Sequence, residues 1–598
     1  MHYSLIGRLV AKSDSQCVQI LNEIPAGTSL LELSWNELNK IPGISLALIL
    51  EKIPLSVNSL DLSNNNLSDM NITELTKAIH ALSNGVTFLD LSWNDLGKFT
   101  SLELKQLLSI IPQQVRELNF AENGIFLHGV NEISEIFKAI TKNIISIHLD
   151  VNGLQNKSRE ELREIFRALP LNINSLNLII NYKDKELESD LTAIFAALPS
   201  HVHTLNVSGN GFEHKNSQEL AIIFASIPSS ITELYLCRNK LGLKTDDELV
   251  KSIGSIHKSL RFLSLSGNNF SNKPGNQLRP IFMAINPGVK SLDLSMNNLG
   301  KYNTLELTEA FAGINNNLSA LSLNENELYL RTGLELAELI LSLPNNLKSL
   351  NLSHNSLHRK SRDDLVKIFS AINFRLTDLN IGFNDLGLQT DADLERSISW
   401  LPKKLKSLNL SNNGLGKKTS AGLALIFNAI SKDLEQLDLS GNNFDIISGP
   451  GLAAAISKFS INLTSLILCD NKLGYKTVVG LQTIISSLPA GVIKLDLRKN
   501  ELSQKTSSEL AIIFASLPAN IRTIDLRDNF LNTKVYANAI AALPKSVTKI
   551  AIDERGFITR AIFSSALVKF GLFATSNNRK VHDRSLIDTT ELRTLSVE

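Results

Sequence analysis

The sequence is poor in cysteine, in net charge and in long apolar runs, and each shortage excludes a class of protein. Its three cysteines in 598 residues cannot form a disulfide framework and lack zinc-ligand spacing, so we expect a reducing intracellular environment. Sixty basic and 59 acidic residues leave a net charge of +1, without the basic excess of a nucleic-acid-binding protein. No stretch approaches the roughly 18 apolar residues of a membrane span. The first residues also lack the pattern of a secretory signal, so we expect neither a membrane span nor a leader.

Patterns of catalytic residues are equally scarce. Glycine-rich phosphate loops and metal-ligand clusters are absent from the sequence. His148 and Asp150 share one face of a predicted strand, but no nucleophile accompanies them. We therefore expect no enzyme activity, no catalytic residue, no cofactor and no metal.

What the chain does have is an asparagine at every twenty-ninth position, without a slip. The series is Asn36, Asn65, Asn94, Asn123, Asn152, Asn181, Asn210, Asn239, Asn268, Asn297, Asn326, Asn355, Asn384, Asn413, Asn442, Asn471, Asn500 and Asn529. Each lies in the frame apolar-x-x-Leu-x-Leu-x-x-Asn-x-Leu, with occasional Val, Ile or Phe for Leu. A fixed period of this length predicts a stacked repeat architecture.

Each repeat has two halves with different periodicity. The Leu-x-Leu core alternates as a short, half-buried strand does. Ser or Thr six residues after the asparagine, followed by Glu three residues later, predicts a capped helix start, as at Thr100/Glu103, Ser158/Glu161, Thr245/Glu248, Thr332/Glu335 and Thr506/Glu509. A proline at a constant place after many of the asparagines, as Pro112 follows Asn94, ends the helix. Pro280 inside one predicted helix should shorten or kink it.

The frame resembles that of leucine-rich repeats, and a strand plus a full helix in a unit of this length is similar to the ribonuclease-inhibitor-like class. The resemblance implies a buried asparagine side chain that hydrogen-bonds the turn backbone. It predicts an α/β solenoid, a horseshoe with parallel strands on the concave face and helices on the convex face. Strands stack at about 4.8 Å and helices need about 8–10 Å, so the strands must lie inside, and this many repeats should approach a full turn.

The same frame divides the chain. Residues 1–25 are expected to be an N-terminal capping partial repeat, with Gly7 in the asparagine slot and a capping box at Ser13 and Gln16. Residues 26–546 form the array, and residues 547–574 a shortened last repeat and C-terminal cap, whose apolar part runs from Ile558 to Ala574. Residues 575–598 are expected to be a flexible polar tail.

The concave slot four residues before each asparagine is rich in acidic residues. Seven of its eighteen occupants are Asp or Glu and none is Lys or Arg, including Glu32, Asp61 and Asp90. One interpretation is an acidic groove for a basic partner. The other is that the repeat template favours Asp and Asn there, because small polar side chains suit the end of a stacked strand.

Large side chains interrupt this polar pattern and mark candidate partner-binding residues. The candidates are Trp35, Phe88 and Trp93 beside Glu32, Asp61 and Asp90, and a second group of Tyr235, Arg238 and Phe262. Aromatic residues are enriched at interface hot spots. The alternative is that the aromatic side chains pack on one another or on the N-terminal cap. A third group, Lys494, Arg498, Lys499 and Arg527 among aspartates, is expected to be a solvated charge lattice.

These features predict a monomeric protein-binding scaffold. A composition rich in Asn, Lys, Ile and Ser, with repeats of a class commonest in eukaryotes, resembles effectors that intracellular bacteria inject through a type IV secretion system. The resemblance implies a bacterial cytoplasmic origin, delivery to the host cytosol and a host protein as partner. The alternatives are an endogenous inhibitor or sensor of the ribonuclease-inhibitor kind and, with less support, the substrate-recognition arm of an enzyme.

Overall fold

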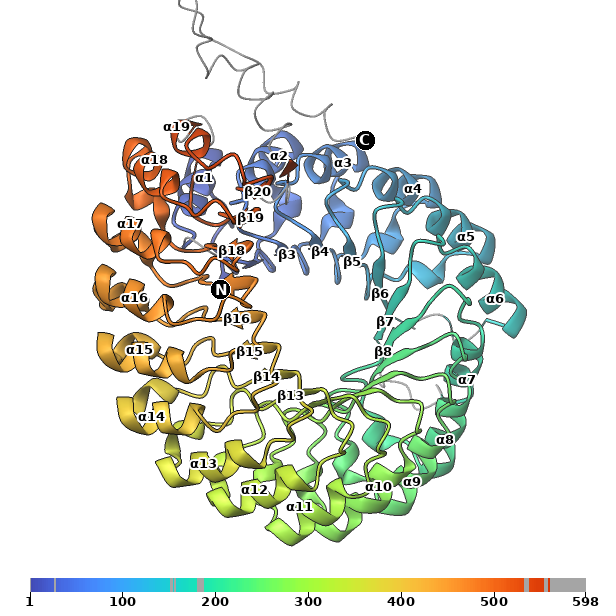
Figure 1. Cartoon of the computed structure of the whole chain (residues 1–598). Coiled ribbons are helices and arrows are strands. Elements are labelled where there is room, and N and C mark those ends of the chain that lie inside the picture. The colour runs from blue at the N-terminus through green and yellow to red at the C-terminus, as the bar shows by residue number, and fades with distance from the viewer. Residues whose placement is uncertain are drawn as a thin grey trace, which may run out of the picture.

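The computed structural model describes residues 2–25, 28–150, 154, 157–179, 188–531, 537–552 and 558–559. Within them the chain forms one curved solenoid, with the strands on the inside and the helices on the outside (Figure 1). The array winds through nearly a full turn, so the predicted horseshoe almost becomes a ring (Figure 1). The predicted α/β leucine-rich-repeat solenoid is therefore confirmed.

A single parallel sheet lines the concave side. Its strands are β1 His2–Ser4, β2 Leu30–Glu32, β3 Ser59–Asp61, β4 Phe88–Asp90, β5 Glu117–Asn119, β6 Ser146–Asp150, β7 Ser175–Ile179, β8 Thr204–Asn206, β9 Glu233–Tyr235, β10 Phe262–Ser264, β11 Ser291–Asp293, β12 Ala320–Ser322, β13 Ser349–Asn351, β14 Asp378–Asn380, β15 Ser407–Asn409, β16 Gln436–Asp438, β17 Ser465–Ile467, β18 Lys494–Asp496, β19 Thr523–Asp525 and β20 Lys549–Ala551. Within the array each strand pairs in register with the next, as Leu60 does with Leu89. The sheet ends on β21, Ile558–Thr559, which runs antiparallel to β20.

Helices form the outer layer. They are α1 Asp14–Asn22, α2 Gly43–Glu51, α3 Ile72–His80, α4 Ser101–Ser109, α5 Val130–Lys138, α6 Arg159–Arg167, α7 Glu188–Ala196, α8 Ser217–Ala225, α9 Asp246–Gly254, α10 Leu278–Ala284, α11 Thr304–Phe311, α12 Gly333–Leu341, α13 Arg362–Ala371, α14 Asp391–Ile398, α15 Ser420–Ala429, α16 Gly449–Ile456, α17 Val478–Ser486, α18 Ser507–Ala515 and α19 Ala537–Ala541. All five predicted capping boxes are present. Helix α10, which contains Pro280, has seven residues where α9 has nine, as predicted.

The described repeat asparagines form hydrogen-bonded ladders from one repeat to the next. The described asparagines of the series are at most 3 % exposed, while Asn152 and Asn181 lie outside the described residues. Asn65 is typical: its Oδ1 accepts the backbone N–H of Asn36 at 2.8 Å, and its Nδ2 donates to the carbonyls of Leu33 and Leu62 at 3.0 and 2.9 Å. Because a buried amide without partners is costly, this ladder accounts for the constancy of the residue along the chain.

The N-terminal residues continue the ladder as a partial repeat. Strand β1 pairs with β2, and Gly7 takes the asparagine slot with φ +67°. The Oδ1 of Asn36 accepts the N–H of Leu9, and Ser13 forms its capping box with Gln16. Of the expected shortened repeat and cap at 547–574, residues 547–552 and 558–559 are described, and the polar tail at 575–598 lies outside the described residues.

Candidate functional site

Side chains in the slot four residues before each asparagine have a backbone role. Asp61 Oδ1 accepts the N–H of Ser63 at 2.8 Å, and Asp90 Oδ1 accepts the N–H of Ser92 at 2.8 Å. Asn206, Asn351 and Asn409 accept the amide two residues on in the same way. The interpretation that the template favours Asp and Asn here is therefore supported, because both side chains can accept this bond.

Accepting this hydrogen bond requires an oxygen atom but no negative charge. The N-terminal strands nevertheless place negatively charged side chains in this slot on three successive strands. Glu32 lies opposite Asp61 in the sheet register, and Asp61 lies opposite Asp90. Burial, opposed by hydrogen bonds from Ser63 and reinforced by the charges of Asp90 and Glu32, raises the pKa of Asp61. In the described part of the chain neither Asp61 nor Asp90 forms an ion pair with Lys or Arg, and Glu32 is 3.1 Å from the ring of His2. Among the described residues, three stacked carboxylates thus face the concave side without a lysine or arginine to neutralise them.

Trp35 and Trp93 lie beside this row and are exposed. Each precedes its repeat asparagine in a left-handed turn, with φ of 57° and 56°. Their exposed fractions are 62 % and 49 %. Ring contacts among the described residues join neither tryptophan to another aromatic side chain, so the alternative of mutual packing is not supported.

Phe88 is half-buried on β4 and packs elsewhere than expected. Its ring centroid lies 5.5 Å from that of His148 on β6. His148 Nε2 is 2.6 Å from Glu117 Oε1, and this hydrogen bond lowers the pKa of Glu117. The three candidate aromatics are therefore two exposed tryptophans and a phenylalanine that belongs to a separate Phe88–Glu117–His148 cluster.

The second candidate group is brought together in part. Tyr235 on β9 and Phe262 on β10 pack with ring centroids 4.9 Å apart. Burial raises the pKa of Tyr235. Arg238 is exposed in the left-handed turn before Asn239, with φ 53°. The role of all nine candidate residues in binding stays a prediction.

In the third group, expected to be a solvated charge lattice, Arg498 and Arg527 form ion pairs with aspartates that are largely buried. Arg498 Nη2 is 2.7 Å from Asp496, and Arg527 Nη2 is 2.6 Å from Asp525. Hydrogen bonding to Asp496 raises the pKa of Arg498. The acidic slots on β18 and β19 are therefore neutralised within the chain.

Two features of the structure were not predicted from the sequence. Phe383 and His354 occupy the same left-handed slot as Trp35 and Trp93, and their rings stack at 4.1 Å, with Phe383 46 % exposed. Six buried lysines lie five residues after repeat asparagines: Lys215, Lys244, Lys273, Lys360, Lys418 and Lys476. Lys360 Nζ, for example, donates to the carbonyl of Tyr329 at 2.6 Å. The repeat period was the available signal for both features.

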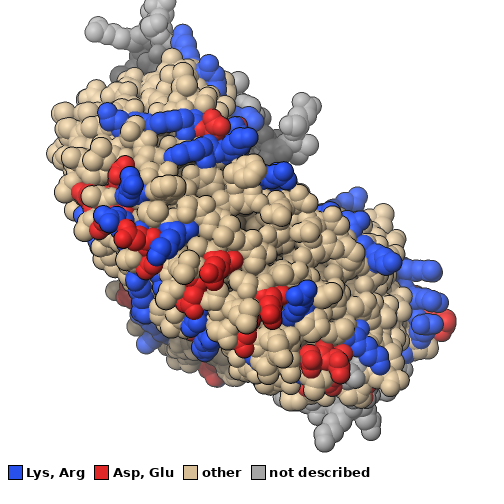
Figure 2. All heavy atoms as spheres, turned by 60° about the horizontal axis from the view of Figure 1, so that its bottom comes forward, with Lys and Arg blue, Asp and Glu red and all other residues tan. Residues whose placement is uncertain are grey.

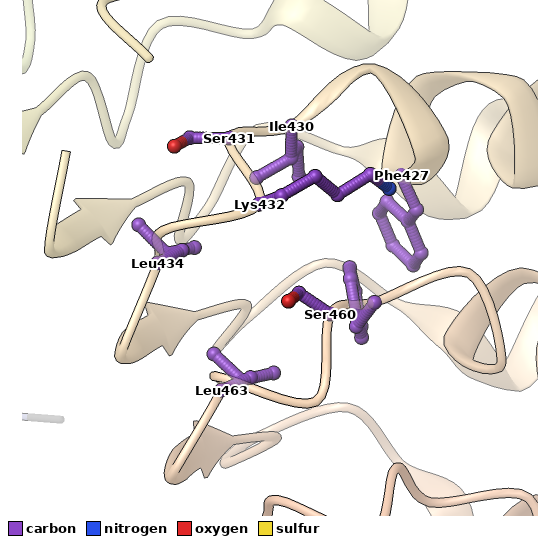
Figure 3. Close-up of a pocket in the computed structure, with 8 residues that line it drawn as sticks. Phe427, Ile430, Ser431, Lys432, Leu434, Ser460 and Leu463 are labelled. Atoms are coloured by element: carbon purple, nitrogen blue, oxygen red, sulfur yellow. The ribbon is translucent and has the colours of Figure 1, made fainter. Parts of the chain in front are cut away.

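The described residues bear on three further features: membrane spans, metal clusters and pockets. The described helices include none long and apolar enough to cross a membrane, and the described side chains include no group of three suited to a metal ion. Figure 3 shows a pocket near the ends of α15 and α16, lined by Phe427, Lys432, Ser460 and Leu463 among others. Its volume of about 10 Å³ holds about one water molecule. A larger hollow of about 290 Å³ lies between α12 and α13 and is lined by Leu341, Pro344 and Phe374 among others.

Comparison with known proteins gives the family. Two models described as "Leucine Rich Repeat" match residues 346–368 and 402–418. Among solved structures, the leucine-rich repeat-containing protein LegL7 from Legionella pneumophila is 34 % identical over 50 % of this chain and 94 % of its own, with a TM-score of 0.44. A chain of the yeast Rad7–Elc1 complex is 17 % identical over 68 % of this chain and 89 % of its own, with a TM-score of 0.33. None of the curated proteins matches. With its constant repeat period, its asparagine ladder and its matching family models, the chain is a leucine-rich-repeat protein.

Proposed function

We propose that this scaffold binds a protein partner at the N-terminal end of its concave face. The observation that carries the proposal is the row Glu32, Asp61 and Asp90 beside the exposed Trp35 and Trp93. In the described part of the chain these half-buried carboxylates have no lysine or arginine neighbour, and the two tryptophans have no ring partner. A partner that supplies basic and apolar groups would stabilise both. The scaffold acts by recognition and not by catalysis.

The test is an affinity capture from host-cell lysate with mass spectrometry, followed by binding measurements on the captured protein. In the Trp35→Ala/Trp93→Ala double variant we expect the affinity to fall at least 30-fold, about 2 kcal/mol, as for a hot spot. The matched control is Trp400→Ala, which removes a tryptophan that is 46 % exposed just beyond the end of α14. Unchanged affinity in the double variant would place the site elsewhere, with Tyr235 and Phe262 next to be replaced.

We further propose that the protein is a bacterial effector delivered to the host cytosol, where it works as a monomer. The composition and the eukaryote-like repeats support this proposal, and residues 575–598 are the candidate export segment. A translocation reporter fused to the full chain should enter host cells, and the same fusion lacking 575–598 should not. Equal delivery of both fusions would contradict the role of that segment. Capture of a partner only from bacterial lysate would instead favour an endogenous inhibitor or sensor.

A further inference from the structure

The width of the concave space follows from the number of strands. Twenty parallel strands, β1 to β20, follow one another in the sheet and wind through nearly a full turn (Figure 1). At about 4.8 Å per strand the full turn measures about 96 Å, which corresponds to a diameter of about 30 Å through the strand backbones. Side chains on one sheet face occupy about 5 Å, half the separation of packed sheets, so about 20 Å remains free.

The free width limits which kinds of polypeptide can enter the concave space. An α-helix with its side chains is about 10–12 Å across, and an extended segment is thinner. A folded domain of about 100 residues has a radius of gyration of about 13 Å, which gives a sphere about 33 Å across. A single polypeptide segment therefore fits within the turn, and a folded domain does not.

Charge limits the choice of partner further, because the inner face and the rim at which the strands begin carry charges of opposite sign. Side chains two, four and six residues before each asparagine point to the concave side. Across the eighteen asparagine repeats, these rows hold more accessible carboxylates than basic side chains. The half-buried or exposed carboxylates are Glu32, Asp61, Asp90, Glu117, Glu233, Asp293, Asp378, Asp438 and Asp496. The only Lys or Arg residues in these rows are Lys494, Arg498 and Arg527. The row one residue before the strands carries exposed Arg116, Arg261, Lys290, Lys348, Lys406 and Arg522 against Glu435.

One outer face of the molecule lacks a comparable separation of charge. On the face shown in Figure 2, basic and acidic side chains are interspersed. A net acidic inner face repels the phosphates of a nucleic acid and attracts a cationic chain. Trp35 and Trp93 at its edge add aromatic faces over which Lys or Arg can lie.

We infer that the concave space takes one cationic polypeptide segment, helical or extended, that enters without the folded domain to which it belongs. This inference rests on the proposed function, in which the concave face binds the partner, and it specifies the form of that partner. A domain that displays the same residues on its surface reaches only the rims, and the basic row repels it from the rim at which the strands begin.

The experiment measures fluorescence anisotropy of three labelled probes with the full chain. The first is a helical peptide rich in Lys and Arg, whose length of about 20 residues gives a helix about 30 Å long. The others are its charge-reversed counterpart and the cationic pattern grafted onto one surface helix of a folded domain. We expect the cationic peptide to bind at least tenfold more tightly than either of the others.

Two variants of the full chain locate the contact. The variant Asp61→Asn/Asp90→Asn/Asp293→Asn should weaken binding of the cationic peptide at least tenfold, because three inner charges are lost. The control Glu160→Gln/Glu164→Gln on α6 removes two charges from the outer layer and should leave that binding unchanged.

Two results would overturn the inference. The first is equal binding of the peptide and the grafted domain, which would place the contact on a rim or on the convex face. The second is no preference for the cationic peptide over the charge-reversed one. If a captured partner depends on Trp35 and Trp93 while the cationic peptide does not bind, the proposed function stands and this inference fails. If the peptide binds in an Asp61-dependent way while Trp35 and Trp93 prove irrelevant, the inference stands and the tryptophan site fails.

Discussion

The two ends of the array place aspartate in the same slot but surround it differently. On β3 and β4, Asp61 and Asp90 are followed two residues later by Ser63 and Ser92, which donate hydrogen bonds and carry no charge. On β18 and β19, Asp496 and Asp525 are followed in the same position by Arg498 and Arg527, which form ion pairs at 2.7 and 2.6 Å. One residue of the frame thus decides whether an inner carboxylate is neutralised within the chain or left for a partner.

The comparison separates two properties of the aspartates: the oxygen atom that the fold needs and the negative charge that can attract a partner. Both ends use the aspartate oxygen to accept the backbone amide two residues on, so the acceptor is part of the fold. Like charges directly opposite in a sheet are destabilising, and Asp61 lies between Glu32 and Asp90. The N-terminal end therefore tolerates repulsion that the C-terminal end removes, and this unrelieved charge is the physical basis of the proposed site.

The largest stability effect is expected from Arg527→Met. It removes the closer of the two guanidinium groups beside Asp525, whose side chain is only 7 % exposed, and leaves Arg498 at 3.7 Å. Loss of one partner of such a pair should cost about 2–3 kcal/mol. Hydrogen exchange of the amides around β19 measures the loss locally, which suits a solenoid because its repeats open separately.

At the other end, Ser92→Ala should cost about 1 kcal/mol, since it removes one hydrogen bond to Asp90. Equal losses at the two ends would contradict the comparison.

Replacing Asp by Asn at the two ends should change local stability by smaller amounts, and the change should have opposite signs at the two ends. Asp61→Asn keeps the acceptor for Ser63 and removes a repelled charge, so local stability should rise by up to about 1 kcal/mol. Asp496→Asn keeps the acceptor for Arg498 but weakens the ion pair, so local stability should fall by about 1 kcal/mol. Exchange around β3 and β18 reports each change, and the same sign at both sites would break the comparison.

The smallest effect is a pH dependence that comes from Asp61 at the N-terminal end. Because the folded state raises the pKa of Asp61, the folded protein holds that proton more tightly than the unfolded chain does. The resulting stabilisation is present below the usual aspartate pKa and is lost as the pH rises through the raised value. Local stability around β3, measured as the difference between the native chain and Asp61→Asn, should therefore grow on mild acidification. A difference that does not change with pH would remove the electrostatic argument.

Periodic features of the fold could be predicted from the sequence because each depends on contacts that recur every repeat. The capping boxes follow from residues at constant spacing, and the hydrogen-bonding role of the asparagines follows from the resemblance to leucine-rich repeats. The short helix α10 follows from Pro280. Partnerships across repeats could not be predicted, because they depend on side-chain direction. Phe88 reaches His148 two strands away, and nothing in the repeat frame indicates this contact.

The buried lysines show a different limit. Lys360 and its equivalents recur at a constant spacing, but lysine normally marks a solvated surface. Only the fold shows that backbone carbonyls of the preceding repeat surround the ammonium group, as with Lys360 and Tyr329. The candidate site was predictable to the level of its acidic row and its exposed tryptophans, and not to the level of which carboxylates lack a cationic neighbour.

The most direct test transfers the C-terminal arrangement to the N-terminal end. The Ser63→Arg/Ser92→Arg variant gives Asp61 and Asp90 the neighbours that Asp496 and Asp525 have. Our account predicts that local stability around β3 and β4 rises while affinity for the captured partner falls at least tenfold. The control variant Arg498→Ser/Arg527→Ser should lose stability around β18 and β19 and keep its affinity. Partner affinity that stays unchanged in Ser63→Arg/Ser92→Arg, although local stability has risen, would contradict the claim that unneutralised charge at this end forms the binding site.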